Sequence, residues 1–316
     1  MGLRNIMERA AHENRKFFIT NCIKFDTPRL AEETYPEDVK VESDIPYAEA
    51  PKKAGAFADE KYELCCCDRV LDIYTPANAK EGEMFLLIHG GAFVYGCKEL
   101  DKNFAMHLSK ASGVAVANVG YRLIPHADLQ GLLQDIFLAL SYVIKNKGVR
   151  KIHTIGDSAG GYLSILTAIL INSKEARKEC GLAQFDEILA GGAVQEGVRA
   201  VTANPICTSF RHHPKRFCGI FFDADKKMPA YIYDLTKAIT KYGCPPLVLT
   251  TGDKDDMRKE NEFLLKSVQK AGIPVKYDYA VSTDDRPMHH VYQIAHPTWP
   301  ESQKVIAMIC ENVAEA

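Results

Sequence analysis

The stretch "KIHTIGDSAGGYL", Lys151–Leu163, joins a short apolar run to a second run with helical periodicity. Between the two runs, Ser158 has a glycine two residues away on either side, Gly156 and Gly160. Because a glycine carries no Cβ atom, this spacing lets a strand and a helix approach each other closely. The pattern predicts a nucleophile elbow, a sharp strand-to-helix turn that exposes a serine hydroxyl. The alternative is that Ser158 only caps the helix that follows.

Strands and helices alternate from residue 83 to residue 314. We expect strands at 83–90, 113–123, 150–156, 198–207, 244–253 and 274–282, and helices at 102–112, 128–148, 159–172, 258–272 and 300–314. Such alternation predicts right-handed β-α-β crossovers, and therefore an α/β fold with a mostly parallel central sheet flanked by helices. The functional residues of such folds lie at the carboxyl ends of the strands.

Four segments do not follow this alternation. Residues 3–20 are expected to form a helix, and residues 24–60 an irregular arm that precedes the main fold. The stretch 62–76 predicts two short strands joined by a turn. Residues 180–243 hold one weak strand among loops. Their later part is either a lid over the site or an excursion that packs the core, because aromatic side chains fill cores as readily as pockets.

The composition is that of an ordinary globular protein. The chain has 316 residues, 47% of them hydrophobic, and its net charge of -2 gives no basic field for binding nucleic acid. The one basic cluster, "RHHPKRF" at Arg211–Phe217, is expected to be a solvated loop, with contact to an acidic substrate as the alternative. No apolar run reaches the length of a membrane span, and the charged N-terminus is unlike a signal peptide. We therefore expect a cytoplasmic protein.

The ten cysteines are scattered along the chain and are expected to be reduced thiols. The run Cys65-Cys66-Cys67 has the look of a metal or redox site. However, neighbouring side chains on a strand point to opposite faces, and no second cluster has the spacing of zinc ligands. The sequence therefore predicts neither a metal nor a cofactor.

A serine nucleophile needs N–H donors that stabilise the oxyanion formed when it attacks a carbonyl. The segment "HGGAF", His89–Phe93, directly follows an expected strand. Its two glycines expose backbone N–H groups in a tight loop. Gly90 and Gly91 are therefore candidate donors, together with the N–H of Ala159, which follows the serine.

The serine also needs a general base and an acid that orients this base. Asp253, Asp255 and Asp256 follow one of the later strands and compete for the role of the acid. His289 and His290 follow the last strand and compete for the role of the base. The resulting order along the chain, serine, aspartate and then histidine, is the order found in α/β hydrolases.

Five motifs occur in a fixed order along residues 62–314: "HGGAFVYG", "NVGYRLIP", "GDSAGG", "TGDKDDMR" and "MHHVY". In these motifs the chain resembles the hormone-sensitive-lipase-like branch of α/β-hydrolase fold esterases. The resemblance implies a catalytic domain at residues 61–316. It also implies a small cap made from an N-terminal arm, residues 1–60, and an insertion at about 208–243.

The resemblance also narrows the choice of site residues. The family places its acid at the fourth residue of G-x-x-D-P-L, which here is Asp255, although Asp256 and Met257 stand in place of the proline and the leucine. The family's base precedes a small residue and an aromatic one, a pattern that His290 fits with Val291 and Tyr292.

The same resemblance then implies the remaining roles. Ser158 would be the nucleophile, and Gly90, Gly91 and Ala159 would be the oxyanion donors, with no metal in the site.

The implied function is that of a serine carboxylesterase that hydrolyses short- to medium-chain esters through an acyl-enzyme, with no cofactor. The same machinery could instead cleave an amide, such as an arylformamide, or a lactone, or pass its acyl group to an alcohol. Related folds serve as small-molecule receptors where the catalytic histidine is lost, but His290 is present here. The resemblance is compatible with a homodimer, although no residue pattern indicates one.

Overall fold

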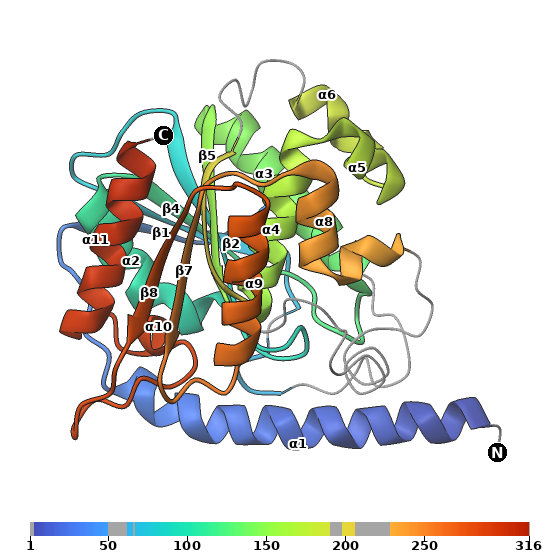
Figure 1. The fold of residues 1–316 in the computed structure, drawn as a ribbon, viewed down its shortest axis with the longest axis horizontal. Helices are drawn as coiled ribbons and strands as arrows, with labels where there is room; N and C mark the ends of the chain where they lie inside the picture. Colours follow the sequence, from blue (N-terminus) through green and yellow to red (C-terminus); the bar gives the residue numbers. More distant parts are fainter. Residues whose placement is uncertain (1–2, 50–61, 66, 190–197, 206–227, 316) are drawn as a thin grey trace.

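A computed structural model describes residues 3–49, 62–65, 67–189, 198–205 and 228–315, which form one mixed sheet between layers of helices (Figure 1). The strands are β1 (Val39–Pro46), β2 (Val70–Pro76), β3 (Glu83–Ile88), β4 (Ala115–Val119), β5 (Lys151–Asp157), β6 (Val198–Pro205), β7 (Leu247–Gly252) and β8 (Val275–Ala280). The main helices are α1 (Leu3–Ala31), α2 (Lys102–Ser112), α3 (Leu129–Lys147), α4 (Ser158–Asn172), α8 (Leu235–Tyr242), α9 (Arg258–Lys270) and α11 (Pro300–Ala314). Short helical segments are η1 (Lys98–Asp101), α5 (Lys174–Glu179), η2 (Ala183–Phe185), α6 (Asp186–Ile188), η4 (Ala230–Tyr233) and α10 (Tyr292–Ala295).

The sheet has the order β1-β2-β4-β3-β5-β6-β7-β8. Strand β2 pairs antiparallel with both β1 and β4, and each remaining pair of neighbours is parallel. The expected α/β fold with a mostly parallel sheet is thus confirmed. In a parallel arrangement, the carboxyl ends of β3, β5, β7 and β8 lie at the same edge, and loops that follow these strands can meet there.

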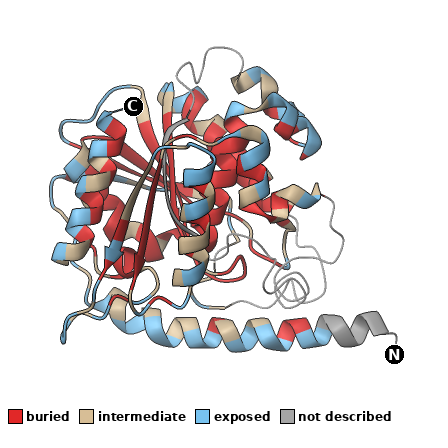
Figure 2. Cartoon of the chain, in the orientation of Figure 1, coloured by how far each residue is buried: buried red, intermediate tan, exposed pale blue. Residues whose placement is uncertain are grey.

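The two faces of the sheet bury separate apolar layers, because successive side chains of a strand point to opposite faces. On β3, Leu86 and Ile88 belong to the layer under α3, α4, α8 and α9. Phe85 and Leu87 belong to the layer under α2, α10 and α11. These two groups of helices lie on opposite sides of the sheet in Figure 1, and the buried residues between them are red in Figure 2.

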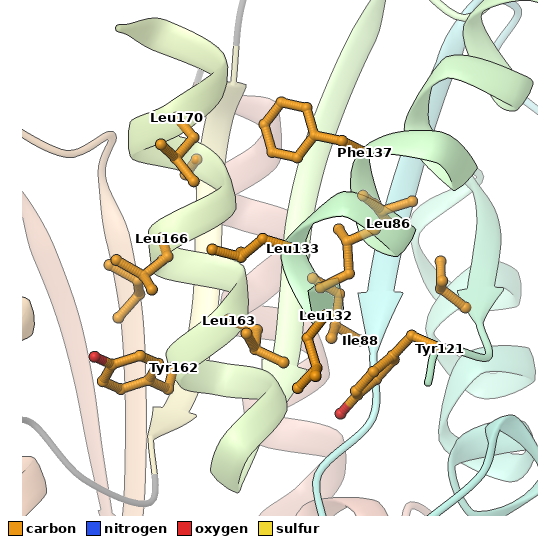
Figure 3. Close-up of a cluster of buried hydrophobic side chains, with 14 of the residues drawn as sticks. Leu86, Ile88, Tyr121, Leu132, Leu133, Phe137, Tyr162, Leu163, Leu166 and Leu170 are labelled. Carbon is orange, nitrogen blue, oxygen red and sulfur yellow. The ribbon is translucent and has the colours of Figure 1, made fainter. Parts of the chain in front are cut away.

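Helix α4 is the centre of the larger layer. All of its residues from Ser158 to Ile171 are buried, because the helix packs on β5 and β6 and is covered by α3, α5 and α8. Figure 3 shows Leu163, Leu166 and Leu170 of α4 beside the α3 side chains of the same cluster. The helix therefore holds its first residue, Ser158, on a rigid base.

The expectation of an irregular arm at residues 24–60 was wrong in two places. Helix α1 runs on to Ala31, and Val39–Pro46 forms the edge strand β1. Most side chains of β1 are exposed or half-buried, and a bulge interrupts its pairing with β2 between Glu42 and Ile45. The alternation of apolar and polar residues by which a strand is recognised covers only Val39–Glu42 and stops at the bulge.

Two further expectations need correction. The described residues of the stretch 62–76 form one strand, β2, and not two, because Cys65 forms only an isolated bridge to Gly96. Residues 180–243 contain the helix α8 besides a strand; Asp234 caps this helix, and its side chain accepts a hydrogen bond from the N–H of Thr236. The basic cluster at residues 211–217, Cys66 and most of the expected insertion at about 208–243 lie outside the described residues.

Candidate active site

Four loops bring the expected site residues to one edge of the sheet. Ser158 follows β5, Asp255 follows β7, and His290 lies in the loop that follows β8. The segment His89–Gly91 follows β3, which lies beside β5 in the sheet. Each loop leaves the carboxyl end of its strand, where ligands bind in folds of this type.

The backbone at Ser158 has the form of a strained turn. Its φ of 51° is left-handed, a conformation that residues other than glycine rarely adopt and that clusters at functional sites. The neighbouring glycines are required by space. A Cβ atom at Gly160 would lie 1.8 Å from the carbonyl oxygen of Ile88, and one at Gly156 would lie 2.5 Å from the same oxygen. The packing of β3 against this turn therefore tolerates only hydrogen at both positions.

Ser158, His290 and Asp255 form a continuous line of hydrogen bonds. The Oγ atom of Ser158 lies 2.9 Å from Nε2 of His290, and Nδ1 of His290 lies 2.9 Å from Oδ1 of Asp255. An ionised carboxylate can only accept hydrogen bonds, so the ring proton belongs on Nδ1. Nε2 is then left to accept the proton of the serine hydroxyl.

The carboxyl group of Asp255 is fully buried and held from three sides. It accepts hydrogen bonds from the hydroxyl of Thr251 at 2.7 Å and from the N–H of Met257 at 2.7 Å, besides its contact with His290. Burial by itself raises the pKa of Asp255, but the hydrogen bonds and the attraction of His290 outweigh it and bring the pKa below its usual value. Asp255 is therefore ionised at neutral pH.

The other candidates for the acid and the base, Asp253, Asp256 and His289, lie away from this line of hydrogen bonds. Asp253 accepts hydrogen bonds from the backbone N–H and the hydroxyl of Ser282, and Asp256 is exposed. His289 is exposed and bridges to Lys254 through its backbone. None of the three is part of the hydrogen-bonded line at Ser158.

The loop after β3 reverses direction within a few residues. Gly91, Ala92 and Phe93 all have positive φ angles, of 106°, 52° and 67°. The N–H groups of Val94 and Tyr95 both donate to the carbonyl of Gly91. Among the described residues, the N–H groups of Gly91 and Ala92 have no acceptor. Two donors close to the serine are therefore available to a ligand.

Gly90 is in a different position from its neighbour. A Cβ atom at Gly90 would lie 2.3 Å from Oδ2 of Asp157, the buried residue that precedes Ser158. Burial raises the pKa of Asp157 to about 6, and the attraction of His290 works in the opposite direction. The backbone of Gly90 thus packs closely against the Asp157 carboxyl group. A second buried carboxyl group, that of Asp101, interacts with Asp157 from η1.

The buried residue His89 supports the loop through two contacts with Tyr121. Its ring stacks on Tyr121 with 4.3 Å between the ring centroids, and the hydroxyl of Tyr121 donates to the carbonyl of His89 at 2.7 Å. Burial lowers the pKa of His89 to about 4, so the ring is neutral at physiological pH. His89 therefore fixes the shape of the loop and carries no charge near the serine.

Sequence reasoning missed the residues that hold the site in place, among them Thr251, Asp101 and Tyr121. Thr251 and Tyr121 stand in the motifs "TGDKDDMR" and "NVGYRLIP", but these motifs do not reveal which groups the two side chains contact. Asp101 and Tyr121 act through contacts between segments that are distant in the chain. Within the described ranges, no group of three His, Cys, Asp or Glu side chains gathers as metal ligands would. No helix of that part of the chain is long and apolar enough to span a membrane.

Comparisons with known proteins agree with this geometry. A family model described as the alpha/beta hydrolase fold matches residues 85–284. The versiconal hemiacetal acetate esterase stcI of Emericella nidulans is 32% identical over 227 residues, which cover 65% of this chain and 74% of that protein. The acetyl esterase of Salmonella dublin is 22% identical over 227 residues, or 65% of each protein. The FAD-linked oxidoreductase pytB of Aspergillus terreus is 26% identical over 216 residues, 65% of this chain, but the chain spans only 26% of that protein's length.

Solved structures of esterases share the fold over nearly the whole chain. Esterase B from Lactobacillus rhamnosis, inhibited by a tributyrin phosphonate, has a TM-score of 0.79 and 24% identity, covering 97% of this chain and 96% of its own. A bacterial heroin esterase has a TM-score of 0.63 and 22% identity, covering 94% and 90%. At these identities the likeness establishes the fold alone. Together with the family model, it shows that the chain belongs to the α/β-hydrolase fold family, in its hormone-sensitive-lipase-like branch of esterase-like hydrolases.

Proposed function

We propose that the protein is a serine carboxylesterase that acts on short- to medium-chain esters through an acyl-enzyme. The observation that carries the proposal is the line of hydrogen bonds from Ser158 through His290 to Asp255. A hydroxyl is a weak nucleophile at neutral pH and is activated by a base that a third group orients. Here Ser158 is the nucleophile, His290 the general base and Asp255 the orienting acid.

The first half of the reaction transfers the acyl group to the enzyme. As Oγ of Ser158 forms a bond to the ester carbonyl carbon, Nε2 of His290 takes the hydroxyl proton. The imidazolium that forms is stabilised by the ionised Asp255. When the tetrahedral intermediate collapses, the bond to the alcohol oxygen breaks, and His290 gives its proton to the leaving alcohol.

The second half returns the enzyme to its starting state. A water molecule takes the place of the alcohol, and His290 removes one of its protons as its oxygen attacks the acyl carbon. Collapse of this second intermediate breaks the bond to Ser158, whose oxygen recovers a proton from His290. The products are one carboxylic acid and one alcohol for each ester and water consumed.

For the oxyanion we propose the N–H groups of Gly90, Gly91 and Ala159 as donors. The N–H of Ala159 lies in the first turn of α4, where backbone amides have no acceptor within the helix. Gly90 and Gly91 lie in the tight turn that follows β3, beside the strand that leads into Ser158. Donors of this kind are worth about 3–4 kcal/mol each in the transition state.

The preference for short acyl groups is supported by the names of the relatives. They include an acetyl esterase and a hemiacetal acetate esterase, and the inhibitor bound to esterase B derives from tributyrin. We also propose that α1 and the segment at about 208–243 form the cap that encloses the substrate. The strand β1 belongs to the sheet and is not part of this cap.

The proposal is tested by the hydrolysis of p-nitrophenyl acetate, butyrate, octanoate and palmitate. We expect the wild type to turn over the short esters fastest, and Ser158→Ala to lose at least about 10³-fold in kcat, because triad residues act as a unit. Circular dichroism of the variant checks that the fold is kept. Equal rates in the two proteins would contradict the role of Ser158. Activity on arylformamides or lactones but not on esters would instead favour an amidase or a lactonase.

A further inference from the structure

The oxyanion loop, residues 89–97, is held in shape by contacts made at Tyr95. The backbone N–H of Tyr95 donates to the carbonyl of Gly91 at 2.9 Å. From the other side, a Cβ atom at Gly91 would lie 2.0 Å from the carbonyl oxygen of Tyr95. The two backbones are thus in direct contact, and a shift of Tyr95 must move Gly91, whose N–H is a proposed donor.

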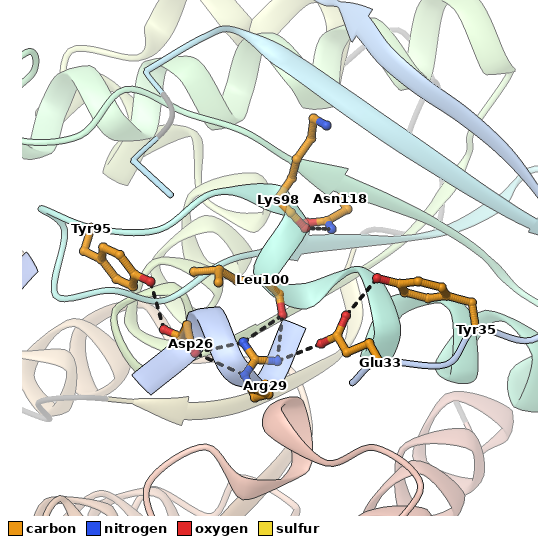
Figure 4. Close-up of polar contacts among 8 residues, drawn as sticks. All are labelled: Asp26, Arg29, Glu33, Tyr35, Tyr95, Lys98, Leu100 and Asn118. Atoms are coloured by element: carbon orange, nitrogen blue, oxygen red, sulfur yellow. Dashed lines mark hydrogen bonds and ion pairs between the residues drawn. The ribbon is translucent and has the colours of Figure 1, made fainter. Parts of the chain in front are cut away.

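The side chain of Tyr95 connects this loop to α1. Its hydroxyl donates a hydrogen bond of 2.9 Å to Oδ2 of Asp26, a residue 69 positions earlier in the chain (Figure 4). Tyr95 is only 3% exposed, and its hydrogen bond to the half-buried Asp26 is partly shielded from water. Burial and the neighbouring Asp26 carboxylate both raise the pKa of Tyr95, which keeps the phenol protonated and able to donate.

Asp26 is in turn fixed by Arg29, one turn further along α1. Nε and Nη2 of Arg29 lie 3.1 and 3.0 Å from Oδ1 of Asp26, which leaves Oδ2 for the tyrosine. The same guanidinium group donates to the carbonyl of Leu100 in η1, at 3.4 Å from both Nη atoms, and to Glu33 at 2.9 Å. Helix α1 therefore binds Tyr95 of the oxyanion loop and also η1, the segment that follows this loop, as Figure 4 shows.

We propose that Tyr95, Asp26 and Arg29 are positioning residues for the oxyanion donors, so that α1 contributes to the rate of the reaction as well as to the enclosure of the substrate. This inference rests on the function proposed above. The three residues touch no reacting atom, and they act by fixing the backbone of Gly91. We call this set the α1 brace.

The α1 brace has a kinetic signature that follows from when the oxyanion exists. Negative charge on the carbonyl oxygen develops in the transition state, so misplaced donors lower kcat and leave ground-state binding of the substrate nearly unchanged. Tyr95→Phe removes a single oxygen atom. For p-nitrophenyl butyrate we expect kcat to fall about tenfold, since small misplacements of catalytic groups have effects of this order or larger. KM should change by less than about twofold, as expected when an interaction made only in the transition state is lost.

A tetrahedral inhibitor reports on the same donors without turnover. A trifluoromethyl ketone forms a hemiketal oxyanion at the serine, so its inhibition constant should rise about tenfold in Tyr95→Phe, in parallel with the loss in kcat. A merely structural role of Tyr95 would lower the melting temperature and the fraction of active enzyme. It would leave the kcat and the inhibition constant of the active fraction, counted by titration with a phosphonate, unchanged.

A double-mutant cycle isolates the contact between the two side chains. Asp26→Ala removes the acceptor while keeping a strong helix former in α1. If the hydrogen bond carries the effect, each single variant loses about tenfold in kcat and the double variant loses no more than either one. Should Tyr95→Phe fail to fold, Asp26→Ala alone carries the test, with Asp26→Asn, which retains an oxygen acceptor, expected to recover most of the lost rate.

Tyr35→Phe is the matched control. The hydroxyl of Tyr35 donates to Glu33 at 2.9 Å, at the end of the same polar network that faces away from the oxyanion loop. This variant should keep kcat within about twofold, as is usual for surface substitutions. An unchanged kcat in Tyr95→Phe, or a raised KM with kcat unchanged, would overturn the inference while the esterase function stands. A wild type without esterase activity would overturn the function itself.

Discussion

Nε2 of His290 lies 2.9 Å from Oγ of Ser158, although 132 residues separate the two in the chain. The contact joins the loop after β8 to the turn after β5, across the carboxyl edge of β6 and β7. Val291 adopts a left-handed backbone next to the histidine, with a φ of 58°, and the hydroxyl of Tyr292 donates to the buried Asp278. The histidine is thus fixed by its own loop and not only by its partners.

Replacing Asp255 by Asn should abolish most of the activity without unfolding the protein. The amide keeps the size of the carboxyl group, but its NH₂ cannot accept the Nδ1 proton of His290. If the NH₂ group turns toward the imidazole of His290, it donates to Nδ1. The ring proton is then on Nε2, which can no longer accept the proton of Ser158. We expect kcat for p-nitrophenyl butyrate to fall on the order of 10³–10⁴-fold.

Asp253→Asn is the control for this variant. Asp253 binds Ser282 and is remote from the imidazole, so its loss should change kcat by less than about threefold. A large loss of activity in Asp253→Asn together with a small one in Asp255→Asn would reassign the acid.

Replacing Gly160 by Ala should destabilise the fold strongly. The new methyl group would meet the backbone oxygens of Ile88 and His89, at 1.8 and 2.5 Å, and neither can move without breaking β3 from α4. We expect the free energy of unfolding, measured in urea, to fall by about 3 kcal/mol or more.

Gly148→Ala provides the comparison. A Cβ atom at Gly148 has no neighbour within 4 Å, but its φ of 64° is left-handed. Backbone strain is then the only destabilising effect, so the free energy of unfolding should fall by about 1 kcal/mol. Equal losses in the two variants would mean that the close approach of β3 to α4 does not limit residue size at Gly160.

The carboxyl group of Asp157 should make stability depend on pH. Burial raises its pKa from 3.8 to about 6, so ionisation is less favourable in the folded protein than in the unfolded chain. The stability due to its protonated form is complete below pH 4 and is lost as the pH rises toward 6. Asp157→Asn removes this loss, so its free energy of unfolding relative to the wild type should increase between pH 4 and pH 7.5. Urea titrations that shift in parallel for both proteins would contradict this.

The sequence was sufficient to predict the elements in which buried apolar residues recur at regular intervals. The helix at 102–112 and the helix at 300–314 have the expected bounds, because their apolar faces repeat with the helical period and Gly113 and Pro300 mark their ends. The elbow at Ser158 was also recognisable, since its glycines are required by local geometry.

Other features depend on contacts that no local pattern encodes. Strand β1 is an edge strand whose apolar and polar residues alternate only over Val39–Glu42, and it is its pairing with β2 that places it in the sheet. Helix α8 did carry a signal, the cap residue Asp234 and a glycine at its end, within a segment of otherwise weak periodicity. Two contacts become visible only once distant loops are placed side by side. They are the hydrogen bond between Tyr95 and Asp26 and the close approach of Gly90 to Asp157.

The most direct measurement of the central claim is the site of covalent labelling by an ester-like phosphonate. The wild type is incubated with a p-nitrophenyl alkylphosphonate, and its intact mass and tryptic peptides are determined by mass spectrometry. The account predicts one adduct per chain, on Ser158, with loss of esterase activity in proportion to labelling and no adduct in Ser158→Ala. Labelling of another residue in step with the loss of activity, or full inactivation without an adduct on Ser158, would contradict it.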